Sequence, residues 1–373
     1  MNLPKHDLSP PIAVTRPAMP EFEAYVEMIR PLWDSRWLSN RGEHVRALEE
    51  ELTEVLGTEH VSLLTNGHLA LETAIDVLGL SGEVITTPFT FASTTHALVR
   101  KGLTPVFCDI NPLDYTLDVS QLESLITDKT SAILPVHVYG NVCHVDEIDR
   151  IAKRHGLKVL YDAAHAFGVT HQGRSIATYG DMSMFSFHAT KVFHTIEGGA
   201  LAYDETSYRD AIEQAVNFGI TGPEAIESVG GNAKMNEFQA AMGRCNLPLF
   251  EHDVMKRRAI VERYDERLRG IPTIRLNRRG DDTVSNYAYY PVLFKGDRRR
   301  RDEMMAWLAE HGIFARKYFY PLVTDFSCYA FDARVPNAKY VSDRILTLPL
   351  YPDMTLEMVD RICDLIIEGG NRT

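Results

Sequence analysis

A lysine and an aspartate near the middle of the chain have the types and spacing for carbonyl chemistry. Lys191 ends the segment Ser186-Phe187-His188-Ala189-Thr190-Lys191, and Asp162 stands 29 residues before it. A lysine amine forms a Schiff base with an aldehyde, and a buried carboxylate keeps a pyridine nitrogen protonated. Pyridoxal phosphate has both an aldehyde and a pyridine ring. The pair therefore predicts a site for this cofactor.

Each of these residues taken singly has a more ordinary interpretation. A lone lysine after a strand is usually solvated, and an aspartate at a strand end usually caps the next helix. The context favours the cofactor, because Asp162 follows the apolar run 158–161 and precedes two alanines. That places it at the carboxyl end of a strand, which is the edge where open α/β sheets bind ligands.

The elements that must position this pair alternate between β-type and helical runs from about residue 41 to residue 246. Such alternation predicts a mostly parallel sheet covered by helices on both faces. The expected strands are Val61–Thr65, Glu83–Thr87, Pro105–Ile110, Ala132–Val138, Lys158–Asp162, Met182–Phe187 and Ala200–Tyr203. The expected helices between them carry apolar stripes and end at Gly57, Gly79 and Gly156.

A change of pattern after residue 246 predicts a second domain. A charged helix is expected over 253–269, a β-type segment over 287–294, and helices over 302–310 and 355–367. We therefore expect residues 1–246 to form an N-terminal segment and a large cofactor-binding domain, and 247–373 a smaller α+β domain. The run Arg298–Arg301 is expected to form a solvated face of a helix.

Composition excludes several classes of function. The 373 residues include 39 Lys and Arg against 51 Asp and Glu, a formal charge of −12 that disfavours binding to nucleic acid or anionic membranes. The five cysteines are scattered, which fits a reducing compartment. No apolar run reaches the roughly 18 residues of a membrane span, and no export signal is seen, so a cytoplasmic location is expected.

Further motifs could complete a cofactor site. The turn Thr65-Asn66-Gly67-His68 between a strand and a helix offers backbone N–H groups to a phosphate, and Phe91 could stack on a flat ring. Neither dinucleotide nor P-loop glycine motifs occur. The 14 histidines show no ligand spacing, so no catalytic metal is expected.

Together these motifs resemble the DegT/DnrJ/EryC1 family of pyridoxal-phosphate sugar aminotransferases, of the fold type I aspartate aminotransferase superfamily. The resemblance spans nearly the full chain. Besides the lysine and aspartate segments, it rests on Val14–Pro17, Trp37–Gly42, Pro105–Ile110, Gly231–Ala241 and Leu346–Pro352.

The resemblance implies a role for individual residues. Lys191 would form the Schiff base, Asp162 would pair with the pyridine nitrogen, and Phe91 would stack on the ring. Gly67, His68 and Ser186 would hold the phosphate, Asn217 would reach the phosphate of a neighbouring subunit, and His165 would lie near the ring hydroxyl. His188 and Tyr320 are candidates for contact with substrate.

Three positions depart from the family's commonest pattern. His68 stands where threonine is usual, His165 where glutamine is usual, and Ala189 where proline is frequent. These departures put a side-chain phosphate contact at residue 68 in doubt. They also give the ring hydroxyl a different hydrogen-bonding group at residue 165.

The activity implied is transfer of an amino group from L-glutamate to a nucleotide-linked keto-deoxysugar in aminosugar biosynthesis, of the kind used for O-antigens and other polysaccharides, by a cytoplasmic homodimer with shared sites. The segment 185–193 and the Thr15-Arg16-Pro17 opening most resemble the branch that aminates C4 of dTDP-4-keto-6-deoxy-D-glucose. Two alternatives remain open: a pyridoxal-phosphate sugar dehydratase or lyase, which Lys191 disfavours, and a non-catalytic sugar-nucleotide-binding protein on the same fold. The exact sugar, its nucleotide and the carbon aminated are not determined by the sequence.

Overall fold

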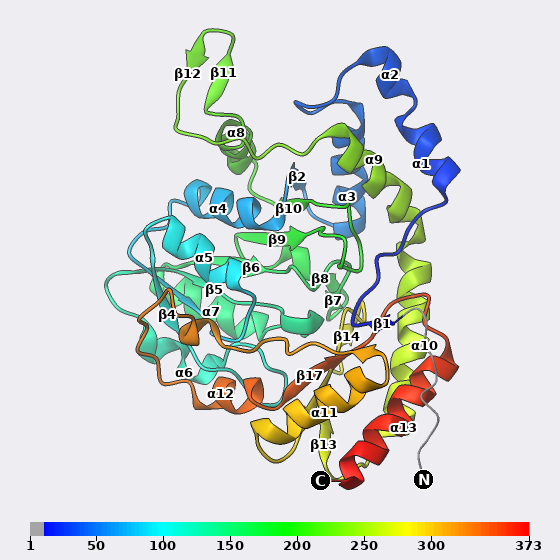
Figure 1. Ribbon diagram of the computed structural model, residues 1–373. Helices are drawn as coiled ribbons and strands as arrows, with labels where there is room; N and C mark the ends of the chain where they lie inside the picture. Colours follow the sequence, from blue (N-terminus) through cyan, green and yellow to red (C-terminus); the bar gives the residue numbers. More distant parts are fainter. Residues whose placement is uncertain (1–10, 373) are drawn as a thin grey trace.

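A seven-stranded sheet forms the centre of the computed structural model, which describes residues 11–372 (Figure 1). Its strands follow the order β2-β10-β9-β6-β5-β3-β4, and all pairs are parallel except the two made by β10. In chain order the strands are β2 (His60–Leu64), β3 (Glu83–Thr86), β4 (Thr104–Phe107), β5 (Thr130–Leu134), β6 (Lys158–Asp162), β9 (Met182–Ser186) and β10 (Gly199–Tyr203). The mostly parallel sheet is confirmed, and each predicted strand is present, although the strands predicted over Pro105–Ile110 and Ala132–Val138 end earlier, at Phe107 and Leu134.

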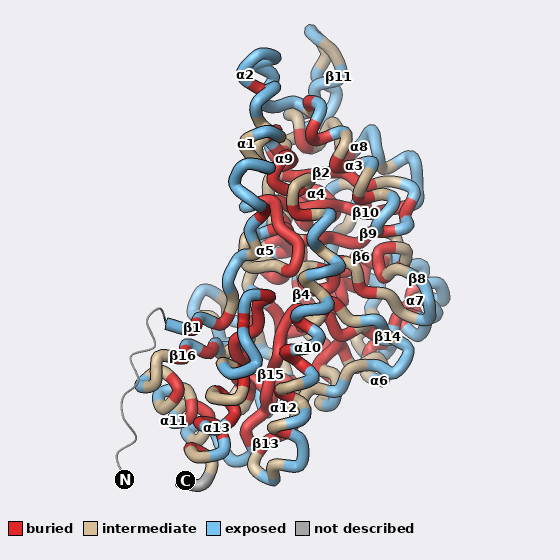
Figure 2. The backbone as a smooth tube through the Cα atoms, turned by 90° about the vertical axis from the view of Figure 1, so that its right-hand side faces the viewer, coloured by how far each residue is buried: buried red, intermediate tan, exposed pale blue. Residues whose placement is uncertain are grey.

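Helices cover both faces of this sheet, as the alternating pattern predicted. One face packs on α4 (Gly67–Val77), α5 (Ala92–Arg100) and α8 (Ser207–Ala215), and the other on α3 (Glu43–Leu56), α7 (Val145–His155) and α9 (Glu237–Asn246). The apolar stripes supply the buried residues of these layers, and Figure 2 shows the buried backbone running through the sheet. Gly57 and Gly156 end their helices in the left-handed conformation, which glycine adopts without steric cost.

A second core lies in the C-terminal part of the chain. The antiparallel sheet β13-β15-β17, with β13 (Ile274–Leu276), β15 (Tyr290–Phe294) and β17 (Ile345–Leu348), packs against three helices. These are α10 (Phe250–Leu268), α11 (Arg298–Glu310) and α13 (Leu356–Arg372). The short strand β1 (Ile12–Ala13) pairs with β16 (Ile313–Phe314), so Ile12 belongs to this core although it is distant in sequence. A domain boundary at residue 246 stays a prediction.

Smaller elements complete the chain. A hairpin of β11 (Ile220–Gly222) and β12 (Ala225–Ile226) projects beyond α8, at the same end of the molecule as the N-terminal helices α1 (Phe22–Ile29) and α2 (Pro31–Ser35) (Figures 1 and 2). The others are α6 (Val119–Leu122), α12 (Pro336–Ser342), β7 (Thr170–His171), β8 (Arg174–Ser175) and β14 (Thr283–Val284). No helix within residues 11–372 combines the length and apolarity needed to cross a bilayer.

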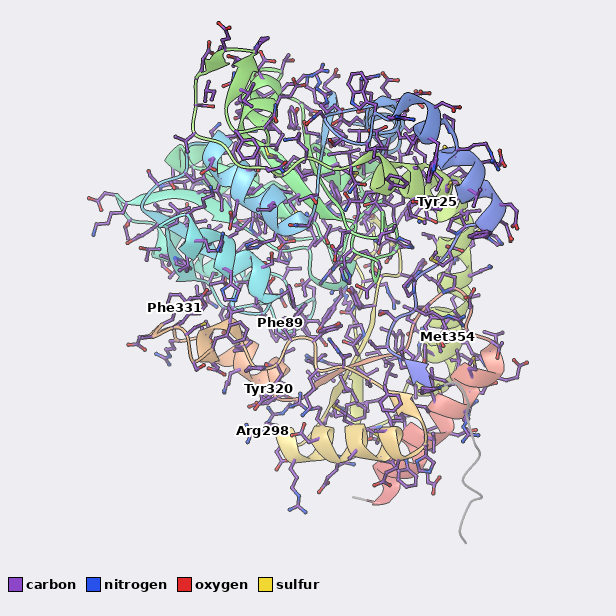
Figure 3. All side chains as sticks on the ribbon, turned by 45° about the horizontal axis from the view of Figure 1, so that its top comes forward. Tyr25, Phe89, Arg298, Tyr320, Phe331 and Met354 are labelled. Carbon is purple, nitrogen blue, oxygen red and sulfur yellow. The ribbon has the colours of Figure 1, made fainter. Side chains whose placement is uncertain are left out.

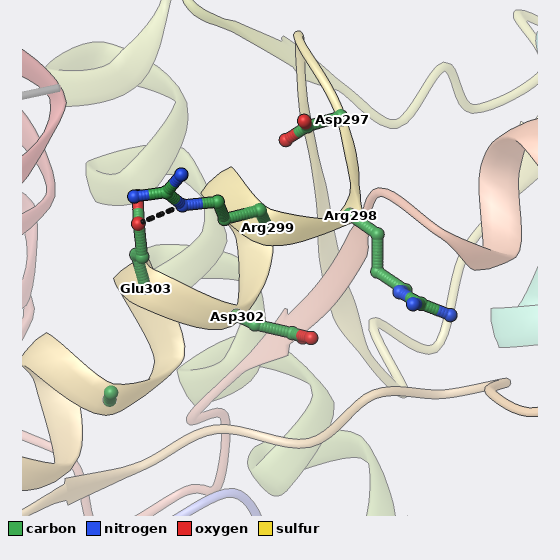
Figure 4. A pocket seen from close by; sticks show the side chains of 6 residues that line it. Asp297, Arg298, Arg299, Asp302 and Glu303 are labelled. Atoms are coloured by element: carbon green, nitrogen blue, oxygen red, sulfur yellow. Dashed lines mark hydrogen bonds and ion pairs between the residues drawn. The ribbon is translucent and has the colours of Figure 1, made fainter.

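The expectation of a solvated face at Arg298–Arg301 is wrong for one residue. Arg301 is fully buried, and its guanidinium donates to the carbonyl oxygens of Ser342 and Ile345 at 3.0 and 3.2 Å. The first turn of α11 lies against the end of α12 and the start of β17, so Arg301 points inward while Arg298 and Arg299 face solvent. Arg299, in contrast, is exposed and pairs with Glu303 at 2.7 Å (Figure 4).

Candidate active site

Lys191 and Asp162 line one cavity of about 560 Å³ at the carboxyl edge of the sheet. Asp162 ends β6 and Ser186 ends β9, and these two strands are neighbours in parallel register. Lys191 lies in the loop that joins β9 to β10, with its N–H bonded to the carbonyl of His188 at 2.9 Å. Because parallel strands end at the same edge, residues 29 positions apart in sequence reach one cavity.

Asp162 is a buried carboxylate held by hydrogen bonds to both oxygens. The Thr94 hydroxyl donates to Oδ2 at 2.7 Å, and the N–H of Ala164 donates to Oδ1 at 3.1 Å. Burial raises the pKa of this carboxyl, while these two hydrogen bonds and the nearby charge of Lys191 oppose the rise. The carboxylate is thus fixed in place and suited to stabilise a cationic ring nitrogen brought into the cavity.

The amine of Lys191 has a lowered pKa, so a larger fraction of it is neutral than in an exposed lysine. Burial lowers its pKa from 10.5 to about 8, against an opposing effect from the Asp162 carboxylate. Its Nζ lies 6.0 Å from the ring centre of Tyr289, so an aromatic side chain forms part of its surroundings. A lysine with a lowered pKa can act both as a nucleophile toward an aldehyde and as a general acid or base.

The N-terminus of α4 forms another part of the cavity wall. Gly67 and His68 begin α4, where the first N–H groups of a helix have no partner inside it. Asn66 caps the helix by accepting from the N–H of Leu69 at 2.9 Å, and Ser186 lies opposite. A Cβ on Gly67 would stand 2.9 Å from the Cβ of Ser186, so only glycine permits this close approach. The N-terminus of α4 therefore presents backbone donors and a favourable dipole to an anion.

His68 stands where a threonine is usual, and both nitrogens of its imidazole have a partner within the chain. Its Nδ1 lies 2.8 Å from the Ser93 hydroxyl, and its Nε2 lies 3.1 Å from the carboxylate of Glu72. Arg100 also donates to that carboxylate, at 2.5 Å. The ring is therefore fixed at the cavity wall through two partners that sequence patterns did not identify.

His165 is held as one tautomer. Its Nδ1 accepts from the backbone N–H of Tyr139 at 3.0 Å, so the proton of the neutral ring sits on Nε2. Burial and the charge of Lys191 lower the pKa of this imidazole well below its usual value, which keeps it neutral. The ring lies parallel to Phe319 and edge-on to Tyr289, at 5.9 and 4.8 Å between ring centres. His165 thus offers an N–H donor, which suits a phenolic oxygen.

Eight of the ten predicted site residues line this cavity. They are Gly67, His68, Phe91, Asp162, His165, Ser186, His188 and Lys191. The structure brings these residues together around one cavity, and the role of each toward a cofactor stays a prediction.

Asn217 and Tyr320 lie elsewhere. Asn217 lines a separate hollow of about 340 Å³, where its side-chain oxygen accepts from Lys234 at 2.7 Å. Tyr320 receives a hydrogen bond from Arg298 at 2.9 Å, and Figure 3 shows the two side chains together beside α11. The Arg301 guanidinium lies 4.8 Å from the Tyr320 ring centre, so this tyrosine is packed among arginines.

Sequence reasoning missed several residues of the cavity. Thr94, which orients Asp162, and the lining residues Tyr289 and Arg316 were given no role. Thr94 stands three residues after Phe91, at a spacing that returns to the same helix face, and this was the one available signal. Tyr289 and Arg316 come from the C-terminal part of the chain, and nothing in their local pattern marks them.

Within the described chain, no group of three or more His, Cys, Asp or Glu side chains could hold a metal ion.

Comparison with known proteins extends these observations. A dTDP-4-amino-4,6-dideoxy-D-glucose transaminase of Shigella dysenteriae is 39% identical over 362 residues, covering 96% of this chain and 99% of that protein. A GDP-perosamine synthase of Vibrio cholerae is 29% identical over 340 residues, covering 89% and 92%. The crystal structure of DesI with its TDP-sugar product superimposes with a TM-score of 0.91 at 33% identity, covering 97% of this chain and 96% of that one.

The family itself is shown by a match over nearly the whole length. The model of the DegT/DnrJ/EryC1/StrS aminotransferase family matches residues 21–367. This range contains every residue of the cavity described above. The chain therefore belongs to the DegT/DnrJ/EryC1/StrS aminotransferase family.

Proposed function

We propose that this protein is a pyridoxal-phosphate-dependent aminotransferase that moves the amino group of L-glutamate to a nucleotide-linked keto-deoxysugar. The observation that carries the proposal is the single cavity that holds a near-neutral lysine, a buried carboxylate and an open helix N-terminus together. Membership of an aminotransferase family supports it.

The residues present fit pyridoxal phosphate in three ways. Lys191 would provide the amine for its aldehyde, Asp162 would provide the carboxylate for its ring nitrogen, and the start of α4 with Ser186 would provide the donors for its phosphate. When bound, this cofactor supplies an electron sink that stabilises negative charge on the substrate carbon. The Nε2–H of His165 is the donor that we assign to the ring hydroxyl.

The chain's own groups would then do two tasks. The Lys191 amine would move a proton between the substrate carbon and the cofactor carbon that carries the aldehyde, a general acid–base task that requires a pKa near neutrality. Asp162, held by the hydrogen bond from Thr94, would keep a negative charge beside the ring nitrogen. The presence of Lys191 disfavours the dehydratase alternative, and retention of the whole constellation disfavours a non-catalytic binding protein.

For the substrate we propose dTDP-4-keto-6-deoxy-D-glucose, aminated at C4. Support comes from the higher identity to a transaminase named for a dTDP-4-amino sugar, 39% against 29% for the GDP-perosamine synthase. The test is a panel of dTDP- and GDP-linked 3-keto and 4-keto sugars incubated with glutamate, with products identified by mass and proton couplings. We expect stoichiometric 2-oxoglutarate and the highest kcat/KM for the dTDP-linked 4-keto sugar. Higher kcat/KM for a GDP-linked or 3-keto sugar would contradict the specificity and leave the reaction class standing.

We further propose a homodimer whose sites are shared. Asn217 lies outside the cavity of its own chain, next to a projecting hairpin that exposes Ile220 and Ile226 (Figure 1). Exposed apolar side chains on a projecting segment are typical of an interface. Mixing an inactive Lys191→Ala protein with an inactive Asn217→Ala protein should restore activity, because a mixed dimer assembles one intact site. No recovery after verified subunit exchange would contradict shared sites.

Location in the cytoplasm and a role in a polysaccharide pathway stay predictions.

A further inference from the structure

The cavity holds one positive charge that the proposed cofactor does not use. Its lining within the described chain includes one lysine, Lys191, whose pKa is lowered, one arginine, Arg316, and two carboxylates, Asp162 and Glu197. Lys191 is committed to the cofactor, and the imidazole of His165 is neutral because its pKa is lowered. Arg316 is therefore the cation available to a second ligand.

Arg316 is held in position, yet the described chain gives its guanidinium no ion pair. Its backbone is fixed on both sides by Thr347 of β17, through N–H···O bonds of 3.1 and 2.8 Å. Its guanidinium carbon lies 5.3 Å from the ring centre of Tyr318. Arg299 and Arg263 in the same part of the chain do pair, with Glu303 and Asp360 at 2.7 Å. An arginine stacked on an aromatic face keeps its hydrogen-bonding edge free for an incoming anion.

Arg316 lines the same cavity as Lys191 and as the aromatic ring that faces the Lys191 amine. Burial raises the pKa of Tyr289 to about 12, and the charges of Arg257 and Arg316 work against this rise, which places both guanidinium groups near that phenol. The ring of the same Tyr289 faces the amine of Lys191 at 6.0 Å. Arg316 and Lys191 thus share one aromatic neighbour on the cavity wall.

We propose that Arg316 is an anion subsite used in turn by both substrates: by a carboxylate of the amino donor and by the diphosphate of the sugar nucleotide. The inference rests on the proposed function, in which the two substrates occupy the same cavity one after the other. Both are anions that present paired oxygen atoms, which match the fork of a guanidinium. An anion that leaves water for a partly enclosed cavity already holding two carboxylates needs such a cation.

An unpaired arginine suits this alternation. A fixed internal carboxylate partner would have to be displaced twice in each cycle, at a cost in binding free energy each time. A guanidinium oriented by stacking and backbone contacts can release one anion and accept the next.

The experiment measures the two half-reactions separately in Arg316→Met, Arg316→Lys and Arg299→Met. In the first, protein carrying pyridoxal phosphate is mixed with glutamate. In the second, protein reconstituted with pyridoxamine phosphate is mixed with dTDP-4-keto-6-deoxy-D-glucose, so it does not depend on the first. Both are followed by the change in cofactor absorbance. Arg299→Met is the matched control, because Arg299 does not line the cavity and is exposed where it pairs with Glu303 (Figure 4).

We expect the apparent dissociation constants of both substrates to rise on the order of 30-fold in Arg316→Met, the size typical of a lost charged hydrogen-bonding pair. Arg316→Lys should lie between that variant and the wild type, and Arg299→Met should match the wild type. Cofactor affinity and absorbance should stay unchanged in all three, which separates a substrate contact from a structural defect.

A rise for neither substrate would overturn the subsite, and a rise for only one would overturn its shared use. Equilibrium binding of glutarate and of thymidine diphosphate to the same proteins provides a readout that needs no turnover. If the wild type reacts with neither substrate, the proposed function fails. In that case, weaker binding of glutarate and of thymidine diphosphate by Arg316→Met than by the wild type would still support the subsite. Equal binding of both ligands by wild type and Arg316→Met would overturn it.

Discussion

The lowered pKa of Lys191 predicts how fast the cofactor-free protein captures pyridoxal phosphate at different pH values. Only the neutral amine attacks the aldehyde, so the capture rate should rise with pH and level off as pH passes about 8. At pH 7 about a tenth of the amine is neutral with a pKa of about 8, against about 0.03% for an ordinary lysine at 10.5. The surroundings of Lys191 therefore account for a gain of about 300-fold in reactive amine at pH 7.

Replacing the neighbouring carboxylate tests the cause of this pKa. The charge of Asp162 raises the pKa of Lys191 against the larger lowering by burial, so Asp162→Asn should move the midpoint of the capture profile to lower pH. Asp76→Asn is the control, because Asp76 pairs with Lys101 on the surface of α4 and does not line the cavity. Stopped-flow absorbance of cofactor-stripped protein over a pH range spanning 8 provides the measurement.

Two results would refute this reasoning. A wild-type midpoint close to 10.5 would mean that burial does not lower the pKa of Lys191. A profile unchanged in Asp162→Asn would mean that the two groups do not interact. Asp162→Asn should also transaminate far more slowly, because a neutral amide does not stabilise a protonated ring nitrogen.

Two further substitutions test the close packing of the site and of the C-terminal core. Gly67→Ala should weaken binding of pyridoxal phosphate by about 10-fold or more, because the added methyl group meets Ser186. Overpacking that costs about 1.4 kcal/mol corresponds to a factor of about ten in the dissociation constant. Equilibrium titration with the cofactor measures this effect, and the control Gly370→Ala, whose Cβ would make only ordinary contact, should bind normally. Arg301→Met should lower the free energy of unfolding by about 2–4 kcal/mol, because two buried carbonyl oxygens lose their donor. Urea denaturation measures the second effect, with Arg299→Met as the exposed control; equal stability of the two variants would show that the buried guanidinium contributes nothing.

The elements of the large sheet and the edge that carries the cavity could be predicted from the sequence because both depend on local patterns. Alternation of short apolar runs with amphipathic helices implies a parallel sheet, and parallel strands bring their carboxyl ends to one edge. Asp162 and Ser186 end neighbouring strands of that sheet, and Gly67 begins the helix that follows β2. Their assembly around one cavity therefore follows from strand order, and Lys191 follows from its place between β9 and β10.

Tertiary structure alone decided which side chains surround this pair. Arg316 and Tyr289 reach the cavity from the C-terminal part of the chain, because β15 and β17 pack in one apolar cluster with residues that follow β3 and β5 of the large sheet, and Arg316 pairs with β17. Arg301 is buried because the four arginines form the first turn of α11, which packs on β17. Consecutive arginines therefore face opposite sides of the helix, and one side is the protein interior while the other is solvent. Hydrophobic periodicity records which face of an element is inward, but it does not record which distant element fills the space it faces. The polar partners of a site arise from those distant contacts, and only the folded chain determines them.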